Sequence, residues 1–205
     1  MKHTYFVTGI GTEVGKTIVS AILTESLQAD YWKPIQAGDL ENSDSIKVKK
    51  LVSNESIVFH KNSFALTMPM SPHAAAEIDG VKIFSNKIKR PNTDNNLIIE
   101  GAGGLMVPIS DKEIIADLIQ PKDRIILVSR HYLGSINHTL LTIEALKSRK
   151  LQCFGIIFSG KKNKSTESII EKMSGVPVLG RIDQEPYFDQ NIVKEYADIF
   201  REKLQ

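Results

Sequence analysis

The chain has 205 residues, of which 41% are hydrophobic and 24% are charged, the balance of an ordinary globular protein. Its 26 basic and 24 acidic residues leave a net charge of +2, which gives no reason to expect a nucleic acid or an anionic membrane as partner. No apolar run approaches the roughly 20 residues that span a bilayer, so we expect a cytoplasmic protein. The one cysteine, Cys153, lies in an apolar stretch and is expected to be buried.

Short apolar runs alternate with longer helical patterns along the chain. Strands are predicted over residues 5–8, 31–35, 97–99, 125–129, 154–158 and 176–179. Helices are predicted over residues 17–28, 114–119, 135–148, 165–173 and 191–203. The strands are almost continuously apolar, which is typical of a parallel sheet covered on both faces. We therefore expect one α/β domain over residues 1–205, with a doubly wound, mostly parallel sheet and helices on both faces.

The strongest motif is the sequence GIGTEVGKT, which begins at Gly9 and ends at Thr17. It follows a predicted strand and opens a predicted helix, the setting of a phosphate-binding P-loop. Glycines let the backbone turn so that its N–H groups face an anion, Lys16 can reach the outer phosphates, and Thr17 can ligate Mg²⁺. Five residues separate Gly9 from Gly15, where the usual motif has four. The alternative is a glycine turn that only caps a helix.

Four further groups of residues are candidates for the site. Glu100 ends a buried strand, and either Mg²⁺ or the amides of its own glycine turn would compensate its charge. Lys33 ends the second strand, where a surface lysine or an ion pair is the common outcome. Asp44 is either a site carboxylate or a helix cap, and His73 is either a substrate contact or a structural histidine. The helix start at residues 133–138 could hold a carboxylate or be capped by Ser135.

Taken together, these segments resemble one enzyme family. The sequences GTEVGKT, YWKP, NSD, SPH, EGAGG and LGSINH occur in that order between Gly9 and His138, and the chain is similar in them to the dethiobiotin synthetases. Beyond His138 the similarity thins to the general α/β pattern. The segment of residues 39–94 is the least regular part of the chain and is expected to carry substrate contacts.

The resemblance implies an ATP- and Mg²⁺-dependent ligase of P-loop type in biotin biosynthesis. Such an enzyme adds CO₂ to one amine of 7,8-diaminopelargonate, phosphorylates the carbamate and closes a cyclic urea. The catalytic residues would be Thr12, Lys16 and Lys33, and Mg²⁺ would be held by Thr17, Asp44 and Glu100. The enzyme would be a homodimer in which the substrate carboxylate is held across the interface.

The same resemblance assigns the remaining contacts. Nucleotide binding would fall to Glu13, Val14, Gly15, Lys16, Thr17, Ile18, Asp44, Glu100, Gly101, Ala102 and Gly103. Substrate binding would fall to Thr12, Lys33, Ala37, Ser135, Ile136 and Asn137, the last three from the neighbouring subunit.

The chain departs from the family pattern in three places. Gly11 stands where the family often has Asp, and Ala37 stands where it often has Ser. Ser159 and Gly160 stand where the family often places an Asn-Asp pair that reads adenine. A glycine has no side chain with which to read a base edge, so we expect weak discrimination among nucleoside triphosphates.

Three other functions compete with this interpretation. A switch ATPase of the partitioning or site-selection kind would share the fold, but such proteins usually carry an extra lysine near the start of the loop, and residues 9–11 have none. A glutamine-dependent amidotransferase would need a glutaminase domain, for which the chain leaves no room. A non-catalytic nucleotide-binding module would leave Lys33 and Asp44 without a role.

Overall fold

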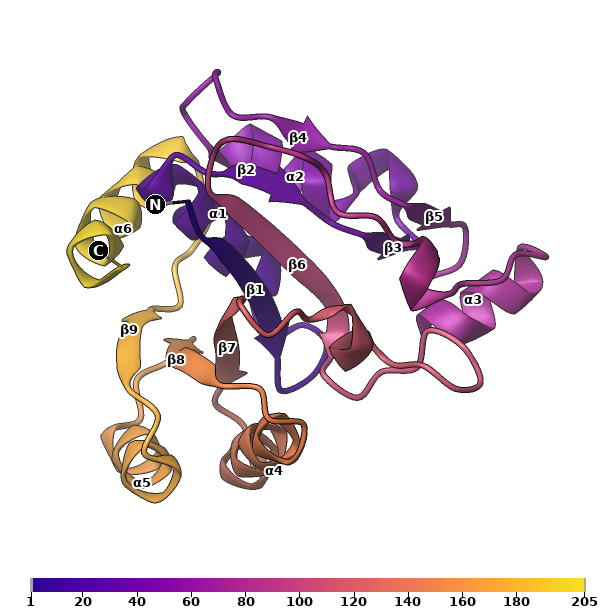
Figure 1. The fold of residues 1–205 in the computed structure, drawn as a ribbon. Coiled ribbons are helices and arrows are strands. Elements are labelled where there is room, and N and C mark those ends of the chain that lie inside the picture. The colour runs from indigo at the N-terminus through magenta and orange to yellow at the C-terminus, as the bar shows by residue number, and fades with distance from the viewer. Residues whose placement is uncertain (1, 205) are drawn as a thin grey trace.

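The computed structural model describes residues 2–204 and is built on a seven-stranded parallel sheet (Figure 1). The strand order is β4-β2-β6-β1-β7-β8-β9. The strands are β1 Thr4–Gly9, β2 Asp30–Trp32, β4 Phe59–His60, β6 Leu97–Gly104, β7 Arg124–Arg130, β8 Cys153–Ser159 and β9 Val178–Ile182. The helices are α1 Lys16–Leu27, α2 Asp44–Leu51, α3 Pro72–Ile78, α4 Ser135–Ser148, α5 Lys164–Ser174 and α6 Gln190–Leu204. Short 3-10 helices are η1 Leu40–Asn42, η2 Ser85–Lys87 and η3 Ile115–Leu118. The predicted fold class is confirmed.

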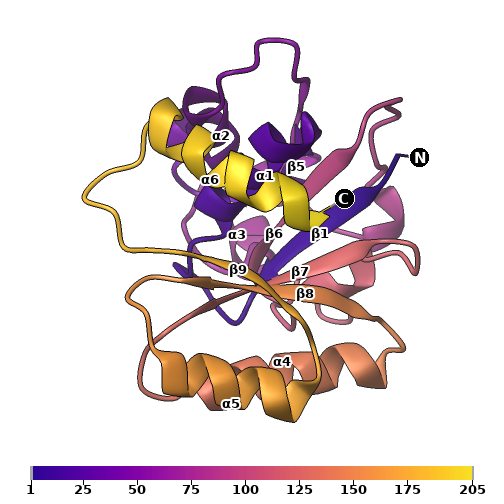
Figure 2. The ribbon, with the colours of Figure 1, turned by 90° about the vertical axis from the view of Figure 1, so that its left-hand side faces the viewer.

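Helices cover both faces of the sheet, as Figure 2 shows, with α1, α2 and α6 on one side and α4 and α5 on the other. Alternate residues of each strand serve the two layers because side chains point to opposite faces with a period of two. In β1, Tyr5 and Val7 pack with α1 and α6, whereas Phe6 packs in the layer that holds Ile143 of α4 and Ile170 of α5. Both layers need apolar side chains, so the strands read as continuous apolar runs.

Strand β1 occupies the centre of the sheet, paired with β6 on one side and β7 on the other. The carboxyl ends of β1 and β6 therefore lie side by side, which brings the start of the phosphate loop next to Glu100. Ligands of parallel α/β sheets bind beyond this edge. Within residues 2–204, no helix has the length and apolar character that crossing a membrane requires.

The strand predicted over residues 31–35 is in fact two strands. β2 ends at Trp32, and β3 (Ile35–Ala37) pairs with β5 (Phe64–Leu66) in a separate two-stranded sheet. Pro34 explains the break, because proline has no N–H for a sheet ladder and restricts the residue before it. Lys33 lies at this break, where the chain leaves the main sheet and its side chain is free to enter the site.

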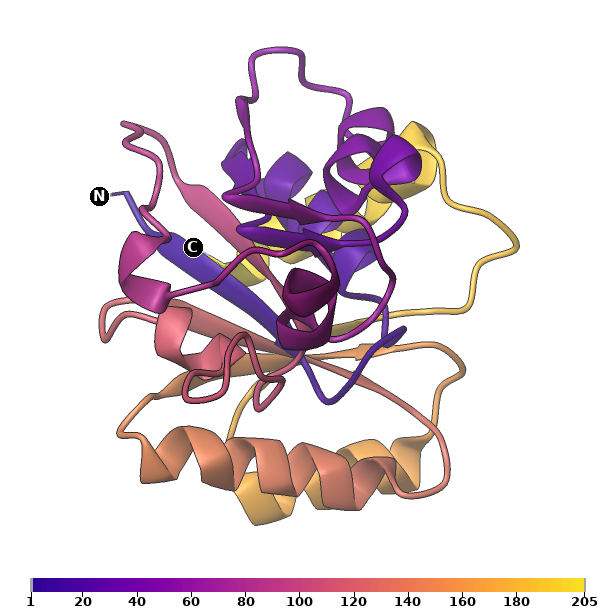
Figure 3. The same ribbon diagram turned by 90° about the vertical axis from the view of Figure 1, so that its right-hand side faces the viewer.

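Two other predicted elements were wrong in kind or in bounds. Residues 114–119 do not form an α-helix but the short η3, whose entry is fixed by a hydrogen bond from the Ile114 amide to Asp117 Oδ2 at 2.8 Å. The last strand begins at Val178 and continues to Ile182, later than the predicted 176–179. The irregular segment of residues 39–94 holds α2, β4, β5 and α3, drawn in purple and magenta in Figure 3.

Cys153 is buried as expected, with 9% of its surface exposed. Burial raises the pKa of its thiol to about 12. The reactive thiolate is therefore scarce near neutral pH. We expect no reaction with Ellman's reagent at pH 8 in the folded protein and one reactive thiol after unfolding in guanidinium. Rapid labelling of the folded protein would contradict this placement.

Candidate active site

The phosphate loop presents an open helix start. Gly15 lies at the N-terminus of α1 with φ of 97°, a left-handed conformation that favours glycine. Within residues 2–204, no side chain caps α1 at this end, which leaves the first amides of the helix available to an anion. A Cβ atom on Gly9 would lie 2.5 Å from Val14 Cγ2, so the turn also requires glycine at its start.

Lys16 folds back over this loop. Its ammonium group donates a hydrogen bond to the carbonyl oxygen of Gly11 at 2.8 Å, and only 7% of the residue is exposed. Burial and, after it, the charge of Lys33 lower the pKa of Lys16 to about 8. A buried ammonium whose nearest acceptor is a neutral carbonyl is a strong site for an anion.

Lys33 lies between two carboxylates. Its Nζ atom is 2.6 Å from Asp44 Oδ2 and 3.0 Å from Glu100 Oε1, and it also donates to Gly101 O at 3.2 Å. Burial alone would lower the pKa of Lys33, but the charges of Glu100 and Asp44 outweigh it and raise that pKa. For Asp44, burial acts to raise the pKa and the Lys33 ammonium overcomes it, so the net direction is downward. Lys33 and Asp44 are therefore both charged at neutral pH.

Three oxygens of this cluster converge on one point. Thr17 Oγ1 lies 3.1 Å from Asp44 Oδ1 and 3.1 Å from Glu100 Oε1. A threonine hydroxyl has a single proton, so it can satisfy one of these two carboxylate oxygens and not both. Two carboxylates and the lone pairs of a hydroxyl suit a hard cation, and Mg²⁺ binds through one or two carboxylates together with water and substrate phosphate. The donor set at this point fits Mg²⁺.

These groups line a cavity of about 690 Å³ at the carboxyl ends of the strands. The residues expected there from the sequence and found in its lining are Thr12, Glu13, Gly15, Lys16, Thr17, Ile18, Lys33, Ala37, Asp44, Glu100, Ala102 and Gly103. The lining also holds residues to which the sequence assigned no contact, of which Ser71 and Pro72 belong to the SPH motif: Ile35, Gln36, Lys47, Pro69, Met70, Ser71, Pro72, Val107 and Arg130. Most of these come from the irregular segment, in which substrate contacts were expected.

Some predicted residues lie elsewhere. Val14 is buried beneath the loop, and Gly101 meets the cluster only through its carbonyl oxygen. In the described part of the chain, the lining does not include Ser135, Ile136 or Asn137, which the sequence assigned to the site of a neighbouring subunit. That assignment stays a prediction.

Neither Asp44 nor Ser135, the two residues considered as helix caps, caps a helix. Asp44 is not a helix cap, because Ser43 precedes α2 as the capping residue and Asp44 is the first helical residue. Its backbone amide donates to Gln36 Oε1 at 3.2 Å, which fixes the helix start against β3. Ser135 is likewise the first residue of α4, after Gly134, and does not cap it.

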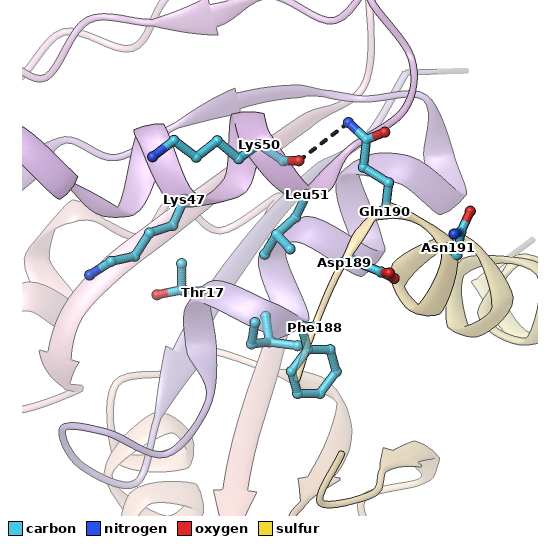
Figure 4. A pocket seen from close by; sticks show the side chains of 9 residues that line it. Thr17, Lys47, Lys50, Leu51, Phe188, Asp189, Gln190 and Asn191 are labelled. Carbon is cyan, nitrogen blue, oxygen red and sulfur yellow. Dashed lines mark hydrogen bonds between the residues drawn. The ribbon is translucent and has the colours of Figure 1, made fainter. Parts of the chain in front are cut away.

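A second cavity of about 860 Å³ adjoins the first and shares Thr17, Ile18 and Lys47 with it. Figure 4 shows it between α2 and the start of α6, with the phosphate loop at one end. Gln190 Nε2 donates to Lys50 O at 3.3 Å and to Val52 O at 3.0 Å, which ties α6 to the end of α2. No motif indicated this cavity, because it depends on how two helices distant along the chain pack together.

Local contacts engage two of the positions that depart from the family pattern, Ser159 and Gly160. Ser159 Oγ donates to the Val14 carbonyl of the phosphate loop at 2.6 Å, so this hydroxyl is already engaged. Gly160 adopts φ of 85°, and its carbonyl accepts a hydrogen bond from Arg181. A Cβ on Gly11 would meet no heavy atom of the described chain within 4 Å, so a larger side chain would fit there.

Comparison with known proteins places the chain in a family. A family described as "AAA domain" matches residues 3–191. The ATP-dependent dethiobiotin synthetase BioD of Christiangramia forsetii is 68% identical over 204 residues, covering 100% of this chain and 99% of the relative. The protein of the same name from Cytophaga hutchinsonii is 49% identical, covering 94% of each chain.

Solved structures agree on the fold. The cell division ATPase MinD of Pyrococcus furiosus aligns with a TM-score of 0.57 at 14% identity, covering 100% of both chains. A ParA family ATPase from Chlorobium tepidum aligns with a TM-score of 0.55 at 15% identity, covering 100% of this chain and 92% of that one. At such identities the likeness concerns the P-loop fold alone, whereas the full-length sequence matches are specific. The chain belongs to the family of ATP-dependent dethiobiotin synthetases.

Proposed function

We propose that this protein converts 7,8-diaminopelargonate, CO₂ and ATP into dethiobiotin, ADP and phosphate. The observation that carries the proposal is the meeting of two buried lysines with two carboxylates beside an open phosphate loop. A protein that only bound a nucleotide would need the phosphate loop but would not need Lys33 buried between Asp44 and Glu100. We further propose that residues 1–205 act as one P-loop domain.

The proposed reaction begins when one amine of the substrate adds CO₂ to form a carbamate. A carbamate oxygen is already anionic, so it attacks the γ-phosphorus of ATP without a protein nucleophile, and ADP leaves. The second amine then attacks the carbonyl carbon, the ring closes and phosphate departs with one former carbamate oxygen. The chain must therefore neutralise crowded negative charge and align the attack.

The residues of the cavity suit these tasks. Lys16 would contact the outer phosphates, Lys33 would contact the carbamate and the transferring phosphoryl group, and Thr12 would lie near the amines. Thr17, Asp44 and Glu100 would hold Mg²⁺, which when bound supplies positive charge to the phosphate oxygens. The uncapped start of α1 would supply amide hydrogens to the same oxygens.

We propose a homodimer as the functional form, with Ser135, Ile136 and Asn137 of one subunit receiving the substrate carboxylate of the other. At the start of α4, Leu133 is fully exposed and Ile136 is partly exposed. Exposed apolar side chains of this kind support a contact with a second subunit there. A switch ATPase is the alternative function. The fold is compatible with it, but the phosphate loop lacks the extra lysine of that class and the close sequence relatives carry a different name.

The test measures phosphate release from ATP with Mg²⁺ and bicarbonate, with and without the diamine. We expect release to depend on 7,8-diaminopelargonate and on bicarbonate together. An analogue with a single amine can form a carbamate but cannot close the ring, so it serves as the matched control and should give no cyclic urea. A rate of phosphate release that is the same with and without the diamine would reject the proposal and favour the switch ATPase.

Nucleotide preference gives a separate prediction. Ser159 Oγ is bound to the phosphate loop and Gly160 has no side chain, so neither reads a base edge. Phe188 lines the adjoining cavity and offers an aromatic surface on which any base can stack. We expect rates with ATP, GTP and CTP at equal concentration to agree within about tenfold, because stacking is a contact that all bases share. A hundredfold preference for ATP would contradict this.

A further inference from the structure

Tyr31 contacts the site through Glu100, from the strand next to β6. It lies in β2, which pairs in parallel with β6 so that Tyr31 faces Ile98 in register. Glu100 is two residues beyond Ile98, and residues two apart in a strand point to the same face. The tyrosine is completely buried, and its hydroxyl donates a hydrogen bond to Glu100 Oε2 at 2.9 Å.

The two oxygens of Glu100 therefore have different neighbours. Oε1 lies 3.0 Å from the Lys33 ammonium and 3.1 Å from the Thr17 hydroxyl, within the oxygen cluster. Oε2 receives the Tyr31 hydroxyl, its one hydrogen bond within residues 2–204. A tyrosine hydroxyl has one proton to donate, and the 2.9 Å contact places that proton on Oε2.

We propose that Tyr31 is a positioning residue for the magnesium site: its hydroxyl fixes the Glu100 carboxylate so that Oε1 faces Thr17 and Asp44. The inference rests on the magnesium role proposed above and adds a residue that acts through Glu100. Groups that hold a metal ligand in its orientation typically affect metal affinity by about 10- to 100-fold. Without the hydroxyl, Oε2 would be buried without a donor, and the carboxylate would turn toward Lys33.

The experiment compares Tyr31→Phe with Tyr5→Phe. Tyr5 is a matched control because it is also buried in a central strand, and its hydroxyl contacts Arg124 and Leu204 O, away from the site. Calorimetry measures ADP binding at increasing Mg²⁺ and in EDTA. For Tyr31→Phe we expect a rise of about tenfold in the Mg²⁺ concentration that gives half of the full increase in ADP affinity. ADP affinity in EDTA should be unchanged. Tyr5→Phe should match the unmodified protein in both.

Two results would overturn the proposal: an unchanged Mg²⁺ dependence in Tyr31→Phe, or an equal change in both variants. A measurement on the unmodified protein covers the case in which Tyr31→Phe does not fold. With ¹³Cζ-labelled tyrosine, Mg²⁺ added to the ADP complex should shift the Tyr31 resonance and leave that of Tyr5 in place. An unmoved Tyr31 signal would also refute the proposal. These measurements use Mg²⁺ and ADP without the diamine. They therefore test the role of Tyr31 even if the carboxylation assay fails.

Discussion

Replacing Lys33 by methionine is expected to lower diamine-dependent phosphate release by about a thousandfold and, at the same time, to tighten Mg²⁺ binding by about tenfold. The loss of turnover follows because one charged group aimed at a developing transition state contributes about 10²- to 10³-fold or more. The gain in Mg²⁺ affinity follows because the ammonium is 2.6 Å from Asp44 and 3.0 Å from Glu100, so it competes with the cation for these carboxylates. Calorimetry with Mg²⁺ and ADP, together with the phosphate assay, measures both effects.

The opposite signs of these effects make the Lys33 prediction specific. Methionine has nearly the length of lysine but carries no charge. Removal of one partner from a buried ion pair costs about 3–5 kcal/mol. The unfolding temperature should therefore also fall, and it should recover in part when Mg²⁺ is added. Lys147→Met is the control, since Lys147 is exposed and pairs only with Glu144 within the described chain. Weaker Mg²⁺ binding in Lys33→Met would show that the ammonium supports the cation site and does not compete for it.

The second large effect is expected on ADP binding when Lys16 is replaced. Replacing it by methionine should weaken ADP binding by about a hundredfold or more, because the buried ammonium is the cation of the phosphate loop. In the unmodified protein, the pKa of Lys16 is about 8, below the usual 10.5. Below pH 8 the group is already protonated and binds phosphate directly. Above pH 8 binding must take up a proton, so ADP affinity should fall by up to tenfold for each pH unit.

Calorimetric titration with ADP between pH 7 and 9.5 checks this expectation, and buffers of different ionisation enthalpy report the proton uptake. Lys16→Met should lose the pH dependence as well as the affinity. Lys147→Met again provides an exposed lysine as control. ADP affinity that stays constant to pH 9.5 in the unmodified protein would contradict the role of Lys16.

The sequence predicted most of the main sheet and the phosphate loop, because both depend on neighbours along the chain. Continuous apolar runs identify buried parallel strands, and the residues from Gly9 to Thr17 fix a turn and a helix start locally. The same local reasoning was wrong at residues 31–35, where one strand was expected across Pro34. It also missed α3, whose seven residues are too few for helical periodicity to be clear.

The contacts that complete the candidate site could not be predicted, because they cross between strands and helices. Tyr31 reaches Glu100 through the register of β2 against β6, and Ser159 reaches the phosphate loop from β8. Gln36 meets the Asp44 amide only because β3 leaves the main sheet. Each contact joins residues whose spacing along the chain carries no signal, so only the packed structure reveals them.

The most direct test of the proposed reaction follows one oxygen atom. Bicarbonate equilibrated in ¹⁸O-labelled water serves as the CO₂ source and is diluted into unlabelled buffer immediately before a rapid turnover. We expect the released phosphate to carry one ¹⁸O from CO₂ and the cyclic urea to keep the other. This distribution requires a carbamate oxygen to attack the γ-phosphorus. Phosphate without ¹⁸O, beside a labelled urea, would show that ATP is cleaved by water and would contradict the account.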